Sequence, residues 1–179
     1  MRCILWRSSG SLPLAIQFAS ISVVNVGSGS VVGLSCYIER CAGRDELQDQ
    51  SFSFSGRGEI LASGVLVPEN APSWAQDAQQ LWNEATAAEY VTDRKTGEFR
   101  LSKHGSPQVA KSYVLALPKE LSDADREALV RAYVAEQFSE ARVAVQWAIH
   151  PDHAGTGNVH AHLLVSTRRL EADGFGKKA

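Results

Sequence analysis

Two histidines one residue apart begin an apolar run near the end of the chain, within AIHPDHAGTGNVHAHLLVSTRR. Strand side chains alternate between the two faces of a sheet, so His160 and His162 are predicted to point the same way. The preceding apolar run ends at His150, and the loop between the two runs is too short for a crossover helix. The runs are therefore predicted to pair antiparallel, which brings His150 beside the other two histidines.

Three imidazoles on one sheet face are suited to a divalent metal ion that keeps open positions for water or a substrate oxygen. The alternative is that they are core or surface histidines, which would be the natural interpretation of a single histidine. His153 lies in the intervening loop, where its direction cannot be predicted, and we assign it at most a supporting role beside the metal. Zinc hydrolases and cupins also use a His-x-His pair, so the triad alone does not define a reaction.

The composition is typical of a soluble globular protein, with 44% hydrophobic and 21% charged residues over 179 positions, enough for one domain with a core. A net charge of −2 excludes a strongly basic chain, although two local basic clusters are either solvated faces or phosphate-binding surfaces. An odd number of cysteines without metal-ligand spacing favours a reducing, cytoplasmic setting. The N-terminal apolar stretch is too broken for a signal peptide or a membrane anchor. The first basic cluster comprises Arg94, Lys95, Arg100 and Lys103, and the second comprises Arg168, Arg169, Lys177 and Lys178.

Hydrophobic periodicity predicts an α+β domain with helices packed on an antiparallel or mixed central sheet. Tyr37 falls in a predicted short helix and by itself would be interpreted as a core aromatic residue. The segment 43–58 is expected to be mainly loop, and a hairpin is expected around Thr96 and Gly97. Strands are predicted at 16–24, 59–68, 112–118, 141–150 and 160–167, and helices at 31–41, 74–92 and 123–138, the last one capped by Ser122.

Several blocks of the sequence together resemble the MobA/MobL group of conjugative relaxases, which are HUH endonucleases. These blocks are AIQFASISVV, CYIER, LVPENAPSWAQDAQQLWNEA, YVLALPKELSDADREALVRAYVAEQF and the histidine stretch, and they extend from about Leu14 to the C-terminus. The resemblance implies the relaxase fold, a domain over 14–179 and an extension over 1–13, which we predict to be poorly ordered. Relatives continue beyond the final GFGKKA, so the domain is predicted to be incomplete at its C-terminus.

The resemblance also implies an activity, namely nicking of single-stranded DNA at an origin of transfer during plasmid mobilisation. Carried over by position, Tyr37 is the nucleophile that forms a 5′-phosphotyrosyl intermediate, while His150, His160 and His162 hold Mg²⁺ or Mn²⁺. The implied partners are the origin DNA, accessory mobilisation proteins and a coupling protein. The predicted DNA contacts are the first basic cluster and, from the second, Arg168 and Arg169. No membrane association is expected.

One departure from the resemblance concerns the strand before LALP, where relatives usually carry a glutamate near the metal and this chain has Ser112. A missing carboxylate would leave the metal or the tyrosine less well supported. A second hypothesis is therefore a truncated, non-cleaving chain that still binds the origin. A third, another metal-dependent hydrolase, leaves Tyr37 unexplained.

Overall fold

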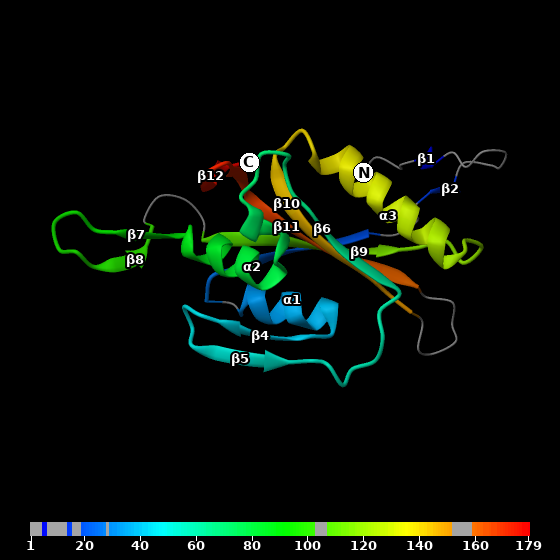
Figure 1. Cartoon of the computed structure of the whole chain (residues 1–179), viewed down its shortest axis with the longest axis horizontal. Coiled ribbons are helices and arrows are strands. Elements are labelled where there is room, and N and C mark those ends of the chain that lie inside the picture. The colour runs from blue at the N-terminus through cyan, green and yellow to red at the C-terminus, as the bar shows by residue number, and fades with distance from the viewer. Residues whose placement is uncertain (1–4, 7–13, 16–18, 28, 103–106, 152–158) are drawn as a thin grey trace.

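A central antiparallel sheet organises the protein, whose computed structural model describes residues 5–6, 14–15, 19–27, 29–102, 107–151 and 159–179 (Figure 1). The strand order is β3-β9-β11-β10-β6, with β12 paired to β11. Each pairing within this sheet is antiparallel, which confirms the predicted α+β class. The strands are β3 (Ala19–Asn25), β6 (Ala62–Leu66), β9 (Gln108–Ala116), β10 (Val143–His150), β11 (His160–Glu171) and β12 (Gly174–Lys178).

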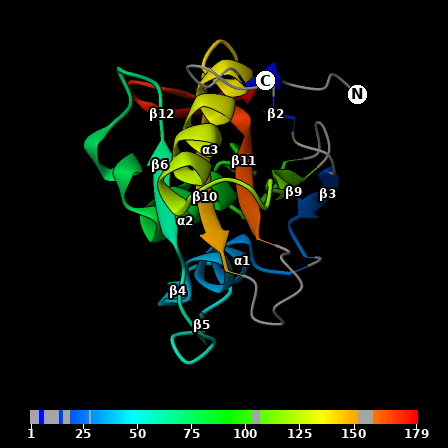
Figure 2. The same ribbon diagram turned by 90° about the vertical axis from the view of Figure 1, so that its right-hand side faces the viewer.

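Helices cover both faces of the sheet, as Figures 1 and 2 show. Helices α1 (Val31–Glu39) and α2 (Ala78–Ala87) lie on one face, and α3 (Asp123–Phe138) lies on the other. Neighbouring residues of β11 therefore serve different cores: Leu164 packs with residues of α1 and α2, and Leu163 packs with residues of α3. Covering both faces explains why all eight residues of β10 are buried, without the polar alternation of a half-exposed strand.

Side-chain caps fix where the helices begin. Ser30 accepts a hydrogen bond from the Gly33 amide at the start of α1, and its hydroxyl also donates to the buried Asp45. Ser122 caps α3 as predicted, accepting from the Asp125 amide at 3.2 Å. None of the helices in the described ranges is long and apolar enough to span a lipid bilayer.

The predicted helix over 74–92 was wrong in its extent. Residues Ser73–Gln76 form a 3-10 turn, and Asp77 then adopts an extended conformation and caps α2 through the Gln80 amide. At the other end, Tyr90–Thr92 is strand β7, which pairs with β8 (Phe99–Leu101). Aromatic and β-branched residues favour strands, and the hairpin pairing decides the outcome over the helical periodicity.

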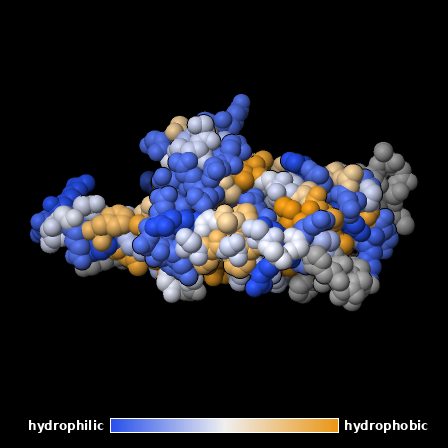
Figure 3. All heavy atoms as spheres, turned by 60° about the horizontal axis from the view of Figure 1, so that its bottom comes forward, coloured by the Kyte–Doolittle hydropathy of each residue, from blue (hydrophilic) through white to orange (hydrophobic). Residues whose placement is uncertain are grey.

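Three further features complete the fold. Where mainly loop was expected over 43–58, β4 (Ala42–Asp45) and β5 (Gln50–Ser53) form a hairpin. The hairpin expected around Thr96 and Gly97 is present as β7–β8, and it projects from the body as an arm of mixed hydropathy at the left of Figure 3. Of the predicted N-terminal extension, only β1 (Leu5–Trp6) is described, paired with β2 (Leu14–Ala15); the remainder lies outside the described residues.

Gly33 allows α1 to lie close against β5. A Cβ built at Gly33 would come within 2.7 Å of the Phe52 ring. We expect Gly33→Ala to lower the free energy of unfolding by about 1–2 kcal/mol, because overpacking outweighs the gain of about 1 kcal/mol in helix propensity. Urea unfolding followed by circular dichroism measures the change.

The matched control is Gly56→Ala, since a Cβ at that position meets no atom within 4 Å. Its stability is expected to stay within about 0.5 kcal/mol of the wild type. Equal stability of the two variants would contradict the close contact between α1 and β5.

Candidate metal and tyrosine site

The β10–β11 register brings the three histidines together. His150 pairs directly with His160, and His162 lies two pairs further along, opposite Ala148. Their ring centroids are 4.6 Å apart for His150 and His162, 4.9 Å for His160 and His162, and 5.5 Å for His150 and His160. One nitrogen from each ring lies within 4.8 Å of the others, a spacing suited to a shared metal ion.

Helix α1 brings Tyr37 to the same end of the sheet. The Tyr37 ring centroid lies 6.2 Å from that of His162 and 6.4 Å from that of His150. A contact between the helix backbone and the sheet holds α1 there, because Nε2 of the buried His150 lies 2.6 Å from the Ile38 carbonyl oxygen. Phe54, just beyond β5, packs edge-on against the Tyr37 ring at 5.6 Å. Tyr37 is thus half-buried between a sheet, a helix end and a hairpin.

The protonation states fit a metal site. A carbonyl can only accept, so Nε2 of His150 carries the proton and Nδ1 keeps its lone pair, the arrangement typical of a histidine whose second nitrogen binds metal. Burial, reinforced by His150, His160 and Arg40, lowers the pKa of His162 to about 3. His162 is therefore neutral at physiological pH, which is the form that coordinates metals.

The remaining tyrosines occupy different environments. Tyr113 of β9 and Tyr133 of α3 pack against the core on the opposite face of the sheet, where burial raises the pKa of each. Tyr90 stacks on Phe99 in the β7–β8 hairpin. Of the chain's four tyrosines, only Tyr37 lies beside the histidines.

Sequence reasoning missed two arginines that lie beside Tyr37. The Arg40 guanidinium carbon lies 4.7 Å from the Tyr37 ring centroid, and that of Arg57 lies 5.8 Å from it. A signal for Arg40 was present, because residues three apart on a helix share a face. No local pattern pointed to Arg57, which follows β5 and reaches Tyr37 only through the fold.

The predicted DNA-contacting arginines lie away from the triad. Arg168 and Arg169 are at the opposite end of β11 from His160, roughly 25 Å along the strand at about 3.3 Å per residue. The β7–β8 hairpin, which carries Arg94, Lys95 and Arg100, begins beside this distant end, since Glu89 just before it binds Arg168.

The predicted DNA-contacting side chains differ in whether another residue of the chain already binds them. Arg168 is engaged with Glu89 and the Gly176 carbonyl, and Arg100 pairs with Asp93 at 2.9 Å. Arg94, Lys95 and Arg169 are exposed. Lys103 and His153 lie outside the described residues.

Ser112 lies on the triad face of β9 but not next to the histidines. Its partner in β11 is Leu164, whereas Val114 pairs with His162 and Ala116 with His160. Residues that pair directly point to the same side of a sheet, so β9 presents only apolar side chains to the triad.

A metal-binding test follows from the triad. We expect His162→Asn to weaken Mn²⁺ binding about 100-fold or more, because one of three nitrogen ligands is lost. His162 is preferred to His150, whose hydrogen bond also anchors α1. Isothermal titration calorimetry with Mn²⁺ measures the affinity, with the exposed Asp173→Asn as the control. An unchanged affinity in His162→Asn would place the metal elsewhere.

Known proteins resemble this chain over most of its length. The MobA/MobL family pattern matches residues 29–179. A probable conjugal transfer protein TraA of Sinorhizobium fredii is 31% identical over 166 residues, which cover 92% of this chain. A probable mobilization protein MobA of Bifidobacterium longum is 30% identical over 159 residues, which cover 88% of this chain.

A solved structure shares the fold. It was determined in work on the molecular basis of vancomycin resistance transfer in Staphylococcus aureus and superposes with a TM-score of 0.73, at 22% identity over 90% of this chain and 76% of the other. The matched region spans only 14% of the TraA protein and 26% of the MobA protein.

Proposed function

Because the chain belongs to the MobA/MobL family, we propose that it nicks single-stranded DNA at an origin of transfer and becomes covalently attached to it through Tyr37. The relatives named for conjugal transfer and mobilisation support the process. The observation that carries the chemistry is the position of the Tyr37 ring, 6.2 Å from His162, one member of the histidine triad.

In the proposed reaction, the Tyr37 hydroxyl loses its proton and its oxygen bonds to phosphorus. The bond between phosphorus and the 3′-oxygen breaks, and that oxygen takes up a proton. The products are a 5′-phosphotyrosyl link and a free 3′-hydroxyl. A phenoxide is also a good leaving group, so the same tyrosine can release the strand when the ends are rejoined.

His150, His160 and His162 would hold Mg²⁺ or Mn²⁺, which supplies positive charge to the non-bridging oxygens of the phosphate. An all-nitrogen ligand set favours Mn²⁺ over Mg²⁺. His150 is buried, whereas His160 and His162 are partly exposed, so the DNA would approach the metal from the side of these two histidines.

A second candidate function is binding to the origin without cleavage. The apolar β9 residues opposite His160 and His162 favour it, because no carboxylate from that strand supports the metal or the tyrosine. Both functions include the same proposed partners: origin DNA, accessory mobilisation proteins and a coupling protein, in the cytoplasm.

The deciding experiment incubates the protein with Mn²⁺ and single-stranded oligonucleotides that tile a candidate origin. Denaturing electrophoresis then separates covalent protein–DNA adducts. A retarded band whose cross-linked peptide contains Tyr37 is the expected result. Tight oligonucleotide binding with bound metal and no band would replace the nicking function with origin binding alone.

A further inference from the structure

Arg40 is held at the junction of Tyr37 and the histidine triad. It ends α1 with a left-handed backbone, φ 55° and ψ 37°, which turns the chain away while the side chain folds back. Its guanidinium lies over the Tyr37 ring at 4.7 Å, and Nη1 donates to the Tyr37 carbonyl at 3.3 Å. A planar, permanently charged group is therefore positioned against the proposed nucleophile.

Not every N–H donor of the Arg40 guanidinium is satisfied by a protein acceptor in the described ranges. Nη2 lies 3.2 Å from Nδ1 of His150, the nitrogen that keeps its lone pair. Nε is buried and makes no hydrogen bond to any residue that the structure describes. A buried donor without a partner is unfavourable, so an acceptor that reaches it gains affinity. The fork of N–H groups on arginine matches two oxygens of a phosphate.

The contact between Arg40 and His150 also affects metal binding. A metal ion bound at Nδ1 would use the same lone pair that Nη2 now contacts, so metal and Nη2 compete for one nitrogen. Metal binding therefore frees Nη2 beside the unpaired Nε, and both become available to one anion.

We propose that Arg40 is a phosphate-binding residue that contacts the scissile phosphodiester next to Tyr37, and that it competes with the metal for His150 until that phosphate arrives. The inference rests on the proposed nicking function and adds a residue to it. Arg57 provides a natural comparison, because its exposed guanidinium also lies near Tyr37 but has no contact with the triad among the described residues.

The first test uses dimethyl phosphate, the smallest phosphodiester, and needs no origin DNA. Protein loaded with Mn²⁺ is expected to broaden the ³¹P resonance of dimethyl phosphate, and Arg40→Gln is expected to lose at least about tenfold of this effect. In calorimetry, the same variant is expected to bind Mn²⁺ more tightly than the wild type. Arg57→Gln serves as the control and should match the wild type in both measurements. Broadening that persists in Arg40→Gln would overturn the inference.

The second test measures adduct formation with the oligonucleotide that the wild type cleaves. Arg40→Gln is expected to form the adduct about 100-fold more slowly, as for loss of one charge-stabilising donor, with partial recovery in Arg40→Lys. In a Tyr37→Phe background, replacing the target phosphate by an uncharged methylphosphonate should weaken binding by a larger factor when Arg40 is present than in Arg40→Gln. Wild-type rates in Arg40→Gln would remove Arg40 from the reaction and leave the nicking function intact. If the wild type forms no adduct but Arg40 still binds dimethyl phosphate, the nicking function fails and phosphate binding by Arg40 stands.

Discussion

Replacing Tyr37 by phenylalanine is expected to reduce covalent adduct formation at least about a thousandfold, to the limit of detection, because the attacking oxygen is removed. The phenylalanine ring keeps the edge-on packing against Phe54 and the contacts with the two histidine rings. The fold, Mn²⁺ affinity and oligonucleotide binding should therefore remain close to those of the wild type. Denaturing electrophoresis measures the adduct, and calorimetry measures the binding.

Tyr133→Phe is the matched control, since Tyr133 belongs to α3 and packs against the core on the opposite face of the sheet. It is expected to form the adduct at the wild-type rate. Retention of the adduct in Tyr37→Phe would mean that another hydroxyl attacks, and peptide mapping of the cross-link would identify it. Loss of oligonucleotide binding together with the adduct would instead give Tyr37 a role in holding the DNA.

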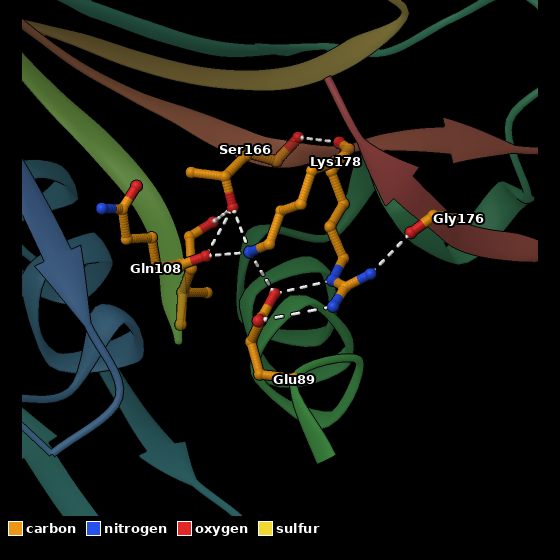
Figure 4. A network of polar contacts seen from close by, with 8 residues as sticks. Glu89, Gln108, Ser166, Gly176 and Lys178 are labelled. Atoms are coloured by element: carbon orange, nitrogen blue, oxygen red, sulfur yellow. Dashed lines mark hydrogen bonds and ion pairs between the residues drawn. The ribbon is translucent and has the colours of Figure 1, made fainter. Parts of the chain in front are cut away.

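The second large effect is expected at Glu89, which is only 3% exposed and binds two cations (Figure 4). One carboxylate oxygen accepts from Nε of Arg168 and from Nζ of Lys178, each at 2.6 Å. Lys178 in turn donates to the Gln108 carbonyl and to the Thr167 hydroxyl. A single carboxylate thus connects the end of α2 to β9, β11 and β12.

We expect Glu89→Gln to lower the free energy of unfolding by about 3 kcal/mol, because it leaves two partly buried cations without a counter-charge. The amide group of glutamine would also direct N–H donors at the donors of Arg168 and Lys178. Urea unfolding measures the loss, and hydrogen exchange should show β12 opening more readily. Glu98→Gln, an exposed position on the β7–β8 hairpin, is the control and is expected to change stability by less than about 0.5 kcal/mol.

A change of similar size in Glu98→Gln, or none in Glu89→Gln, would contradict the structural role of this network. That role matters for the predicted DNA contacts, because it occupies Arg168 with an intramolecular partner. Arg94, Lys95 and Arg169 remain exposed and remain predictions as DNA contacts.

The sequence by itself determined the parts of this protein that depend on short-range patterns. Strand alternation placed His160 and His162 on one face, and a short loop predicted the antiparallel pairing that added His150. The Ser122 cap marked the start of α3. These patterns are local because a strand period or a cap involves only a few neighbouring residues.

Only the tertiary structure decided which residues that are distant in sequence come into contact. Placing α1 over the histidine end of the sheet brings Tyr37 to the triad, and it depends on the close packing at Gly33 and on the bond between His150 and Ile38. The same packing brings Arg40 to His150. Likewise, Tyr90–Thr92 becomes a strand because β8 pairs with it. Helical spacing, exposure and charge leave many such arrangements open, and the choice among them comes from side-chain packing between segments far apart in sequence.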